Sequence, residues 1–224
     1  MLLLFDLDGT LLPDSKTHLD AFALSLKNLF GIDAKTSEIE FPGKTDRLVL
    51  VELAKIHGID ESETRSKMNA LIEFMVTYVK EHISEEEIRP LPGVVRLLGT
   101  LSSRGAELGV VTGSFEPIAF NKLEKAGISS YFHSGIGGFG TDSEDRTEMI
   151  RIALSKARQK IGTHFSAFYV GDTPRDVRAG HSANLRVVAV ATGPFSPEEL
   201  EESGADLAMP DLSDQNKFIR FVSP

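Results

Sequence analysis

Four short apolar runs that each end in small or polar residues constrain the fold of this chain most strongly. The first run, residues 2–5, stops at Asp6. Continuous apolar runs of this length predict strands that are buried on both faces, as in a parallel sheet. The other runs, residues 107–111, 167–170 and 187–190, lead into Thr112-Gly113, Gly171-Asp172 and Ala191-Thr192-Gly193.

Amphipathic helical patterns alternate with these runs. They cover residues 94–102, 117–126, 147–161 and 177–182. Alternation of strand and helix predicts an α/β fold in which helices cover both faces of a parallel sheet. Ligands of such sheets bind at the carboxyl ends of the strands, so the polar residues named above are expected to share one crevice.

Residues 13–88 interrupt this alternation. Their apolar residues recur at helical spacing in three stretches, 19–30, 48–55 and 71–79, without a convincing buried strand. We therefore predict an all-helical insert at 13–88 and a sheet-containing core made of residues 1–12 and 89–224.

Composition narrows the possible partners and metal ligands. A net charge of -9 disfavours binding to nucleic acid or anionic lipid, and residues 1–5 are too few for the apolar part of a signal peptide. The chain has no cysteine, so any metal must bind oxygen or imidazole ligands. These features predict a cytoplasmic protein without a nucleic-acid or membrane partner.

Asp6 and Asp8 follow the first run directly. Alternate residues of an extended segment share a side, and Gly9 permits a tight turn after them. One carboxylate can then attack phosphorus while the other protonates the leaving oxygen and later activates water. The alternative is an acidic turn that only ends the strand.

Thr112, Gly113 and Ser114 follow the second run. A hydroxyl group and free backbone N–H groups at this place can bind phosphate oxygens, which makes these residues candidates for substrate binding. The alternative is that Ser114 caps the next helix.

Asp172 and Asp176 follow the third run. Asp172 is a candidate ligand of a hard cation, and Asp176, one helical turn later, can orient a metal-bound water or a neighbouring cation. With Asp6, Asp172 and one backbone carbonyl, the sequence offers a plausible Mg²⁺ site. The alternative is that both acids cap the helix that starts near Pro174.

A phosphate among four aspartates needs a fixed cation. The candidates are Arg146, Lys122, Arg175 and Lys44. We favour Arg146, because it lies between the second and last of these motifs at the start of a helix. The alternative is a solvated helix residue.

The joint pattern resembles the haloacid dehalogenase-like hydrolase superfamily, in particular its phosphoglycolate phosphatase-like branch. The motifs that carry the resemblance are Asp6-Leu7-Asp8-Gly9-Thr10, then Thr112-Gly113-Ser114, then a basic residue, then residues 171–176. The resemblance spans nearly the whole chain. It implies a Rossmann-like core with a mobile helical cap inserted after the first strand.

The resemblance also implies roles for individual residues. Asp6 would form an aspartyl-phosphate, Asp8 would be the general acid and base, and Thr112 would bind the phosphate. Mg²⁺ would be held by Asp6, the carbonyl of Asp8, and Asp172, with Asp176 behind them. One departure is Arg146, because the family usually carries a lysine there; arginine can make the same charge pairing.

The expected function is a magnesium-dependent phosphatase acting on small-molecule phosphate monoesters. A sugar-phosphate mutase is the main alternative, because mutases of this superfamily also use the position of His18 near the cap hinge. The simpler interpretation of His18 is a surface residue on the first helix of the insert. A phospho-aspartate signalling module is a third possibility, although such modules lack a large helical insert.

Lys44 lies in a predicted turn, residues 41–46, whose counterpart in the resembling branch reaches over the substrate. It could bind a second anionic or polar group of the substrate. The alternative is an ordinary helix-to-helix turn. The sequence leaves the physiological ester and the oligomeric state open.

Overall fold

The computed structural model describes residues 1–132 and 135–223. Its centre is a six-stranded, fully parallel sheet with the strand order β3-β2-β1-β4-β5-β6. This confirms the predicted α/β class. The strands are β1 (Leu2–Phe5), β2 (Glu107–Thr112), β3 (Gly137–Phe139), β4 (Ala167–Gly171), β5 (Arg186–Val190) and β6 (Leu207–Met209).

The four predicted strands are β1, β2, β4 and β5, and their bounds differ from the prediction by one residue at most. The edge strands β3 and β6 were not predicted. Each is only three residues long, and β3 contains Gly137 and Gly138, so neither forms an apolar run that pattern reading can detect.

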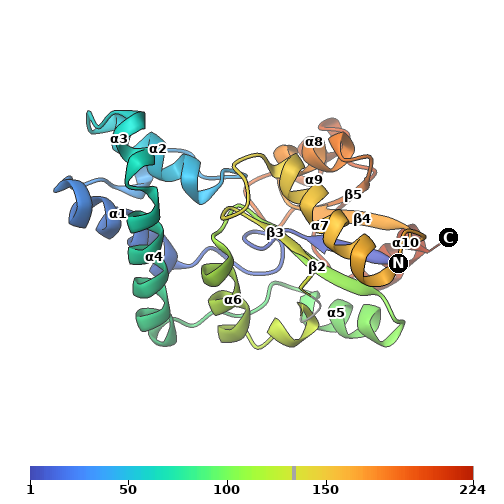
Figure 1. Cartoon of the computed structure of the whole chain (residues 1–224). Coiled ribbons are helices and arrows are strands. Elements are labelled where there is room, and N and C mark those ends of the chain that lie inside the picture. The colour runs from blue at the N-terminus through green and yellow to red at the C-terminus, as the bar shows by residue number, and fades with distance from the viewer. Residues whose placement is uncertain (133–134, 224) are drawn as a thin grey trace.

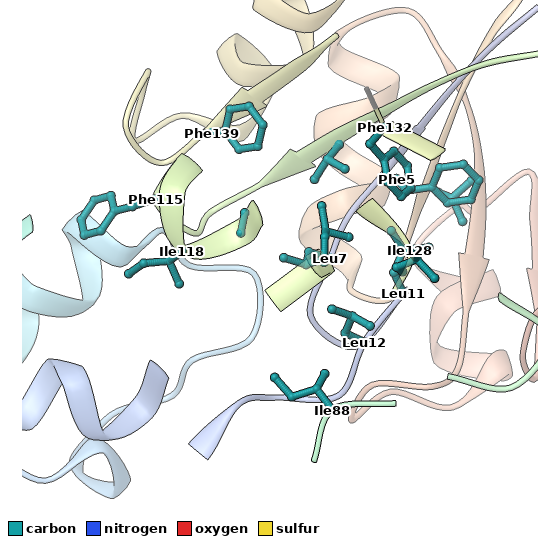
Figure 2. Close-up of a cluster of buried hydrophobic side chains, with 14 of the residues drawn as sticks. Phe5, Leu7, Leu11, Leu12, Ile88, Phe115, Ile118, Ile128, Phe132 and Phe139 are labelled. Atoms are coloured by element: carbon teal, nitrogen blue, oxygen red, sulfur yellow. The ribbon is translucent and has the colours of Figure 1, made fainter. Parts of the chain in front are cut away.

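Helices cover both faces of the sheet, because alternate residues of β1 point to opposite sides. Leu3 and Phe5 belong to one hydrophobic cluster, which includes residues of α5, α6, α10 and of the helices between β1 and α5. Leu2 and Leu4 belong to another, completed by α7, α8 and α9. Figure 2 shows part of the first cluster, where Leu7 and Leu11 lie below Phe5 and Phe132. The helices are α5 (Val94–Ser103), α6 (Glu116–Lys125), α7 (Arg146–Ile161), α8 (Pro174–Ser182), α9 (Pro197–Glu202) and α10 (Gln215–Val222).

Four further helices lie between β1 and α5, with no strand among them, and Figure 1 shows them gathered beyond one edge of the sheet. We call them the cap helices: α1 (Lys16–Phe30), α2 (Asp46–Ile56), α3 (Glu61–Ser66) and α4 (Met68–His82). Three of them match predicted helical stretches, whereas the short, polar α3 was not predicted. The insert limits at residues 13 and 88 stay a prediction. Short 3-10 helices are η1 (Thr36–Glu38), η2 (Ile83–Glu85) and η3 (Ser129–Phe132).

The chain forms a tight turn directly after β1, closed by a parallel bridge between Asp8 and Leu12. Gly9 has a φ of +77°, a conformation that side chains disfavour. Leu7 is fully buried in the core, which leaves Asp6 and Asp8 on the opposite side of the segment, as predicted. No helix in the described part of the chain is both long and apolar enough to span a membrane.

Candidate active site

Asp6 leaves β1 at the centre of the sheet edge and is almost completely buried. Its Oδ1 atom lies 3.0 Å from Nη1 of Arg146. Burial raises the pKa of Asp6 to about 7; Arg146 opposes this rise, and the negative charge of Asp176 adds to it. The ionised form of Asp6, the candidate nucleophile, is therefore stabilised by the neighbouring Arg146.

Arg146 is buried rather than solvated, so the solvent-exposed alternative does not hold. Asp145 caps α7 by accepting from the backbone N–H groups of Thr147 and Glu148, which places Arg146 in the first turn. Its Nη1 atom lies 2.9 Å from Oδ1 of Asp176 and donates to the Tyr169 hydroxyl at 3.0 Å. Burial acts to lower the pKa of Arg146, but the charges of Asp176 and Asp6 outweigh it and raise that pKa.

Asp176 has the structural role that was considered as an alternative. Thr173 is the N-cap of α8, and Oδ2 of Asp176 accepts from its backbone N–H at 3.0 Å and its hydroxyl at 2.6 Å. The other oxygen, Oδ1, accepts from the Tyr169 hydroxyl and pairs with Arg146. Asp176 thus caps a helix and also fixes the guanidinium group beside Asp6.

Asp172 does not cap the helix. Its Oδ1 atom accepts from the Thr10 hydroxyl at 3.0 Å. Burial, together with the charges of Asp176 and Asp6, raises the pKa of Asp172 to about 9. A Cβ atom on Gly193 would lie 1.9 Å from the Asp172 carboxylate, so glycine is required for this loop to pass so close.

These carboxylates fit a divalent cation. One oxygen each from Asp6, Asp172 and Asp176 lies within 4.8 Å of the others. Oδ1 of Asp6 is buried and lies at ion-pair distance from Arg146, but it receives no hydrogen bond of good geometry from the described residues. Arg146 pairs with Asp6 and Asp176, whereas Asp172 forms no ion pair with the residues that the structure describes. An all-oxygen site of this kind suits Mg²⁺.

A second cation, Lys122, holds Asp8. Its Nζ atom lies 2.8 Å and 2.6 Å from the two Asp8 oxygens and donates to the Ser114 hydroxyl at 3.2 Å. The lysine side chain is fully buried on the core-facing side of α6, beside Ile118 and Ala119. Lys122 was predicted as a candidate cation, but its pairing with Asp8 was not predicted. The signal was available: a lysine stands where helical spacing calls for an apolar residue.

The interpretation of His18 as a surface residue is wrong. His18 lies on α1 and is buried, because this side of the helix faces α2 and the core. Its Nε2 atom lies 3.1 Å from Oδ2 of Asp46, and its Nδ1 atom lies 3.3 Å from Nζ of Lys122. An ammonium group can only donate, so Nδ1 accepts and Nε2 carries the proton toward Asp46.

Asp46, at the start of α2, bonds to the loop after β2. It was not predicted as a site residue. Its carboxylate accepts from the backbone N–H of Phe115 at 2.9 Å, and its own N–H donates to the Gly113 carbonyl at 2.9 Å. Thr112 accepts from the Ser114 N–H at 3.2 Å, and the N-cap of α6 is Phe115. Ser114 therefore does not cap that helix; its hydroxyl donates to Asp8 instead.

The predicted site residues, with one exception, line a single cavity of about 440 Å³. Asp176 is the exception, because it lies behind Arg146 and is fully buried. Lys44 lines the cavity from the cap side, and its Nζ atom pairs with the Glu52 carboxylate. The predicted residues on the cavity wall are Asp6, Asp8, His18, Lys44, Thr112, Gly113, Ser114, Arg146 and Asp172.

Comparison with known proteins agrees with this geometry. The model of the family "Haloacid dehalogenase-like hydrolase" matches residues 3–190. A phosphoglycolate phosphatase of Rhodospirillum rubrum is 26% identical, with 99% of this chain and 91% of that protein covered. Phosphoglycolate phosphatase 1 of Pseudomonas aeruginosa is 31% identical, with 95% of this chain and 77% of that protein covered.

A solved structure shows the same fold. The crystal structure of a predicted phosphatase from Clostridium acetobutylicum superposes with a TM-score of 0.74 at 24% identity, with 98% of each chain covered. Since the family model spans most of the sequence and the curated relatives are phosphatases over nearly its full length, the chain belongs to the haloacid dehalogenase-like hydrolase family and is a phosphatase.

Proposed function

We propose that this phosphatase hydrolyses small phosphate monoesters in two steps, transferring the phosphoryl group first to Asp6 and then to water. One observation supports the proposal above the others. The two aspartates that follow β1 have separate buried cations, Arg146 for Asp6 and Lys122 for Asp8. Two carboxylates held apart in this way can take different roles in one reaction.

In the first step, a carboxylate oxygen of Asp6 attacks phosphorus while the bond from phosphorus to the leaving oxygen breaks. Arg146 favours the ionised form of Asp6 that this attack requires. Asp8 gives its proton to the leaving oxygen, so that the product leaves as a neutral alcohol. Thr112, Gly113 and Ser114 are proposed to bind the phosphate oxygens.

In the second step, Asp8 takes a proton from water, and the water oxygen attacks phosphorus. The bond between phosphorus and Asp6 then breaks, which releases phosphate and restores both aspartates. Lys122 and Ser114 hold the Asp8 carboxylate in a fixed orientation for both proton transfers. Lys122 is thus a positioning residue in this scheme.

Asp6 and Asp172, with the carbonyl of Asp8 as the resemblance implies, would hold Mg²⁺. The bound ion supplies positive charge to the phosphate oxygens. Both curated relatives described above are named phosphoglycolate phosphatases, so phosphoglycolate belongs among the esters to be tested.

The mutase alternative needs groups that bind a second sugar hydroxyl. Both ring nitrogens of His18 already have partners, Asp46 and Lys122, so this histidine is not free for such a hydroxyl. The geometry therefore favours hydrolysis over transfer to a second hydroxyl.

Phosphate release from p-nitrophenyl phosphate, ethyl phosphate and phosphoglycolate tests the proposal. We expect a chelator to abolish release, Mg²⁺ to restore it, and Ca²⁺ to restore it poorly, because Ca²⁺ prefers more ligands and looser geometry. Full activity in chelator would remove the metal from the mechanism. Isomerisation of a hexose 1-phosphate without phosphate release would favour the mutase.

A further inference from the structure

The residues on the cap side of the cavity are placed to contact the alcohol part of the substrate. We infer that this part is uncharged and largely apolar, and that Glu52 sets this preference by neutralising Lys44. The inference rests on the proposed phosphatase function and concerns the same cavity. It would separate this chain from relatives whose names contain phosphoglycolate, an ester with a second anionic group.

The first observation is an apolar wall. Phe22 and Phe41 meet edge to face, with ring centroids 5.5 Å apart. A volume of about 440 Å³ exceeds what one phosphate group fills and lies in the range of roughly 300–1,000 Å³ in which pockets bury small organic molecules. The apolar residues of the cap side are Leu19, Phe22, Phe41, Pro42 and Val49, with Leu91 beside them.

The second observation is that Lys44, the cation on this wall, already has an acidic partner in Glu52. His18 offers no positive charge, because its Nδ1 accepts from Lys122 and its one ring proton points toward Asp46. The side of the cavity at the strand ends, formed by Asp6, Arg146 and Asp172, is called the floor. There Arg146 pairs with Asp6 and Asp176. Among the lining residues that the structure describes, no cation remains for a second anion of the substrate. Such an anion would have to lose water without gaining a charged partner.

The third observation is an acid at the mouth of the cavity. Asp14 is exposed and lines the cavity. Partial loss of surrounding water raises the pKa of Asp14, the negative charge of Asp8 adds to this rise, and Lys122 opposes it. A substrate carboxylate beside the ionised Asp14 would be repelled by it.

Lys44 and Glu52 form an ion pair at the beginning of α2. Thr45 caps this helix, so Lys44 precedes its first turn and Glu52 lies on its second. The Lys44 side chain is 13% exposed, whereas that of Glu52 is 44% exposed. Lys44 lines the cavity and Glu52 does not. Replacing Glu52 by Gln keeps its shape and removes its charge, which leaves the charge of Lys44 free for an anionic substrate group.

Three esters of matched design test the inference: ethyl phosphate, benzyl phosphate and 2-phosphoglycolate, in which a carboxylate replaces the methyl group of ethyl phosphate. For the wild-type chain we expect kcat/KM to be highest for benzyl phosphate and lowest for 2-phosphoglycolate. Glu52→Gln should raise kcat/KM for 2-phosphoglycolate about tenfold, as expected for one new charged hydrogen bond. The values for the other two esters should change by less than about twofold.

Two control variants isolate the Lys44 charge. Glu73→Gln removes one negative charge from an exposed position on α4 outside the cavity and should leave all three values unchanged. The double variant Lys44→Met/Glu52→Gln should lose the gain for 2-phosphoglycolate. A misfolded variant cannot produce such a gain, so the expected result is specific.

Two results would overturn the inference while leaving the proposed function intact: a wild-type preference for 2-phosphoglycolate, or no gain for that ester in Glu52→Gln. A wild-type chain that hydrolyses none of the three esters and no aryl phosphate would overturn the proposed function, and the inference with it.

Discussion

The floor and the cap-side wall of the cavity are built on different principles. On the floor, Asp6 and Asp172 lie at the ends of paired parallel strands, and their partners are buried. The wall comes from α1, α2 and the turn between them, and it is mainly apolar. In the proposed function, the reacting residues therefore lie where the sheet fixes their geometry, and the helices of the wall select the substrate.

A few polar contacts join the cap helices α2 and α3 to loops of the core. The Arg47 Nε atom donates to the Gly140 carbonyl at 2.9 Å, and Arg65 pairs with Glu144 at 2.5 Å. Together with the contacts of Asp46, they hold the start of α2 and the end of α3 against core loops. Changes on the floor should therefore impair every substrate, whereas changes on the wall should affect substrates selectively.

The largest effect is expected for Asp6→Asn. An amide cannot attack phosphorus, so turnover should fall by about a thousandfold or more for all esters. The fold should persist, because a buried neutral group replaces a carboxyl that burial already disfavours in its charged form. Phosphate release and the melting temperature check the two parts. Turnover near the wild-type value would show that Asp6 is not the nucleophile.

Arg146 should rank second. Arg146→Ala removes the cation between Asp6 and Asp176, and kcat/KM should fall by about a hundredfold for every ester. Arg146→Lys should keep more activity, because charge matters more here than the fork of the guanidinium group. Steady-state kinetics of both variants, with a melting curve for each, measures the difference. Equal activity of Arg146→Ala and wild type would show that another cation serves the phosphate.

Lys122 should affect the floor in a way that depends on the leaving group. In Lys122→Met the Asp8 carboxylate loses its buried partner and its fixed orientation. We expect kcat for ethyl phosphate to fall about tenfold or more, with KM nearly unchanged, because an alkoxide needs a proton to leave.

The aryl ester provides the comparison for Lys122. p-Nitrophenolate is a good leaving group, so kcat for p-nitrophenyl phosphate should fall less in the same variant. Equal losses for both esters would assign Lys122 a purely structural role. A rise in KM alone would make it a phosphate-binding cation.

The difference between floor and wall also determines which site residues could be predicted from the sequence. On the floor, Asp6, Asp172 and Thr112 stand at the ends of apolar runs, and parallel pairing brings such ends to one edge, so local pattern predicts a shared site. Strands β3 and β6 were missed because pairing with a neighbour, and no pattern of their own, defines them.

Side-chain partners were harder to predict than positions. The pair of Lys122 with Asp8 joins residues that are 114 positions apart, and the packing of α6 against the turn after β1 determines it. His18 was misjudged because its environment depends on how α1 lies against α2 and the core. A sequence pattern shows which face of a helix is apolar, but not which polar residue of another element meets it.

The smallest effect is expected on the wall, for Phe41→Ala. Phe41 is partly exposed, lines the cavity and packs against Phe22, so its removal should cost little stability but take apolar contact from the substrate. For benzyl phosphate we expect kcat/KM to fall about fivefold, which corresponds to about 1 kcal/mol of lost apolar burial. Ethyl phosphate has no aromatic ring to pack against Phe41, so Phe41→Ala should hydrolyse it at the wild-type rate. If both esters lose activity equally, the ring shapes the turn at residues 41–46 as a whole rather than contacting the alcohol part. In that case the separation between a chemical floor and a selective wall would fail at Phe41, since a cap residue would then control a step common to all substrates.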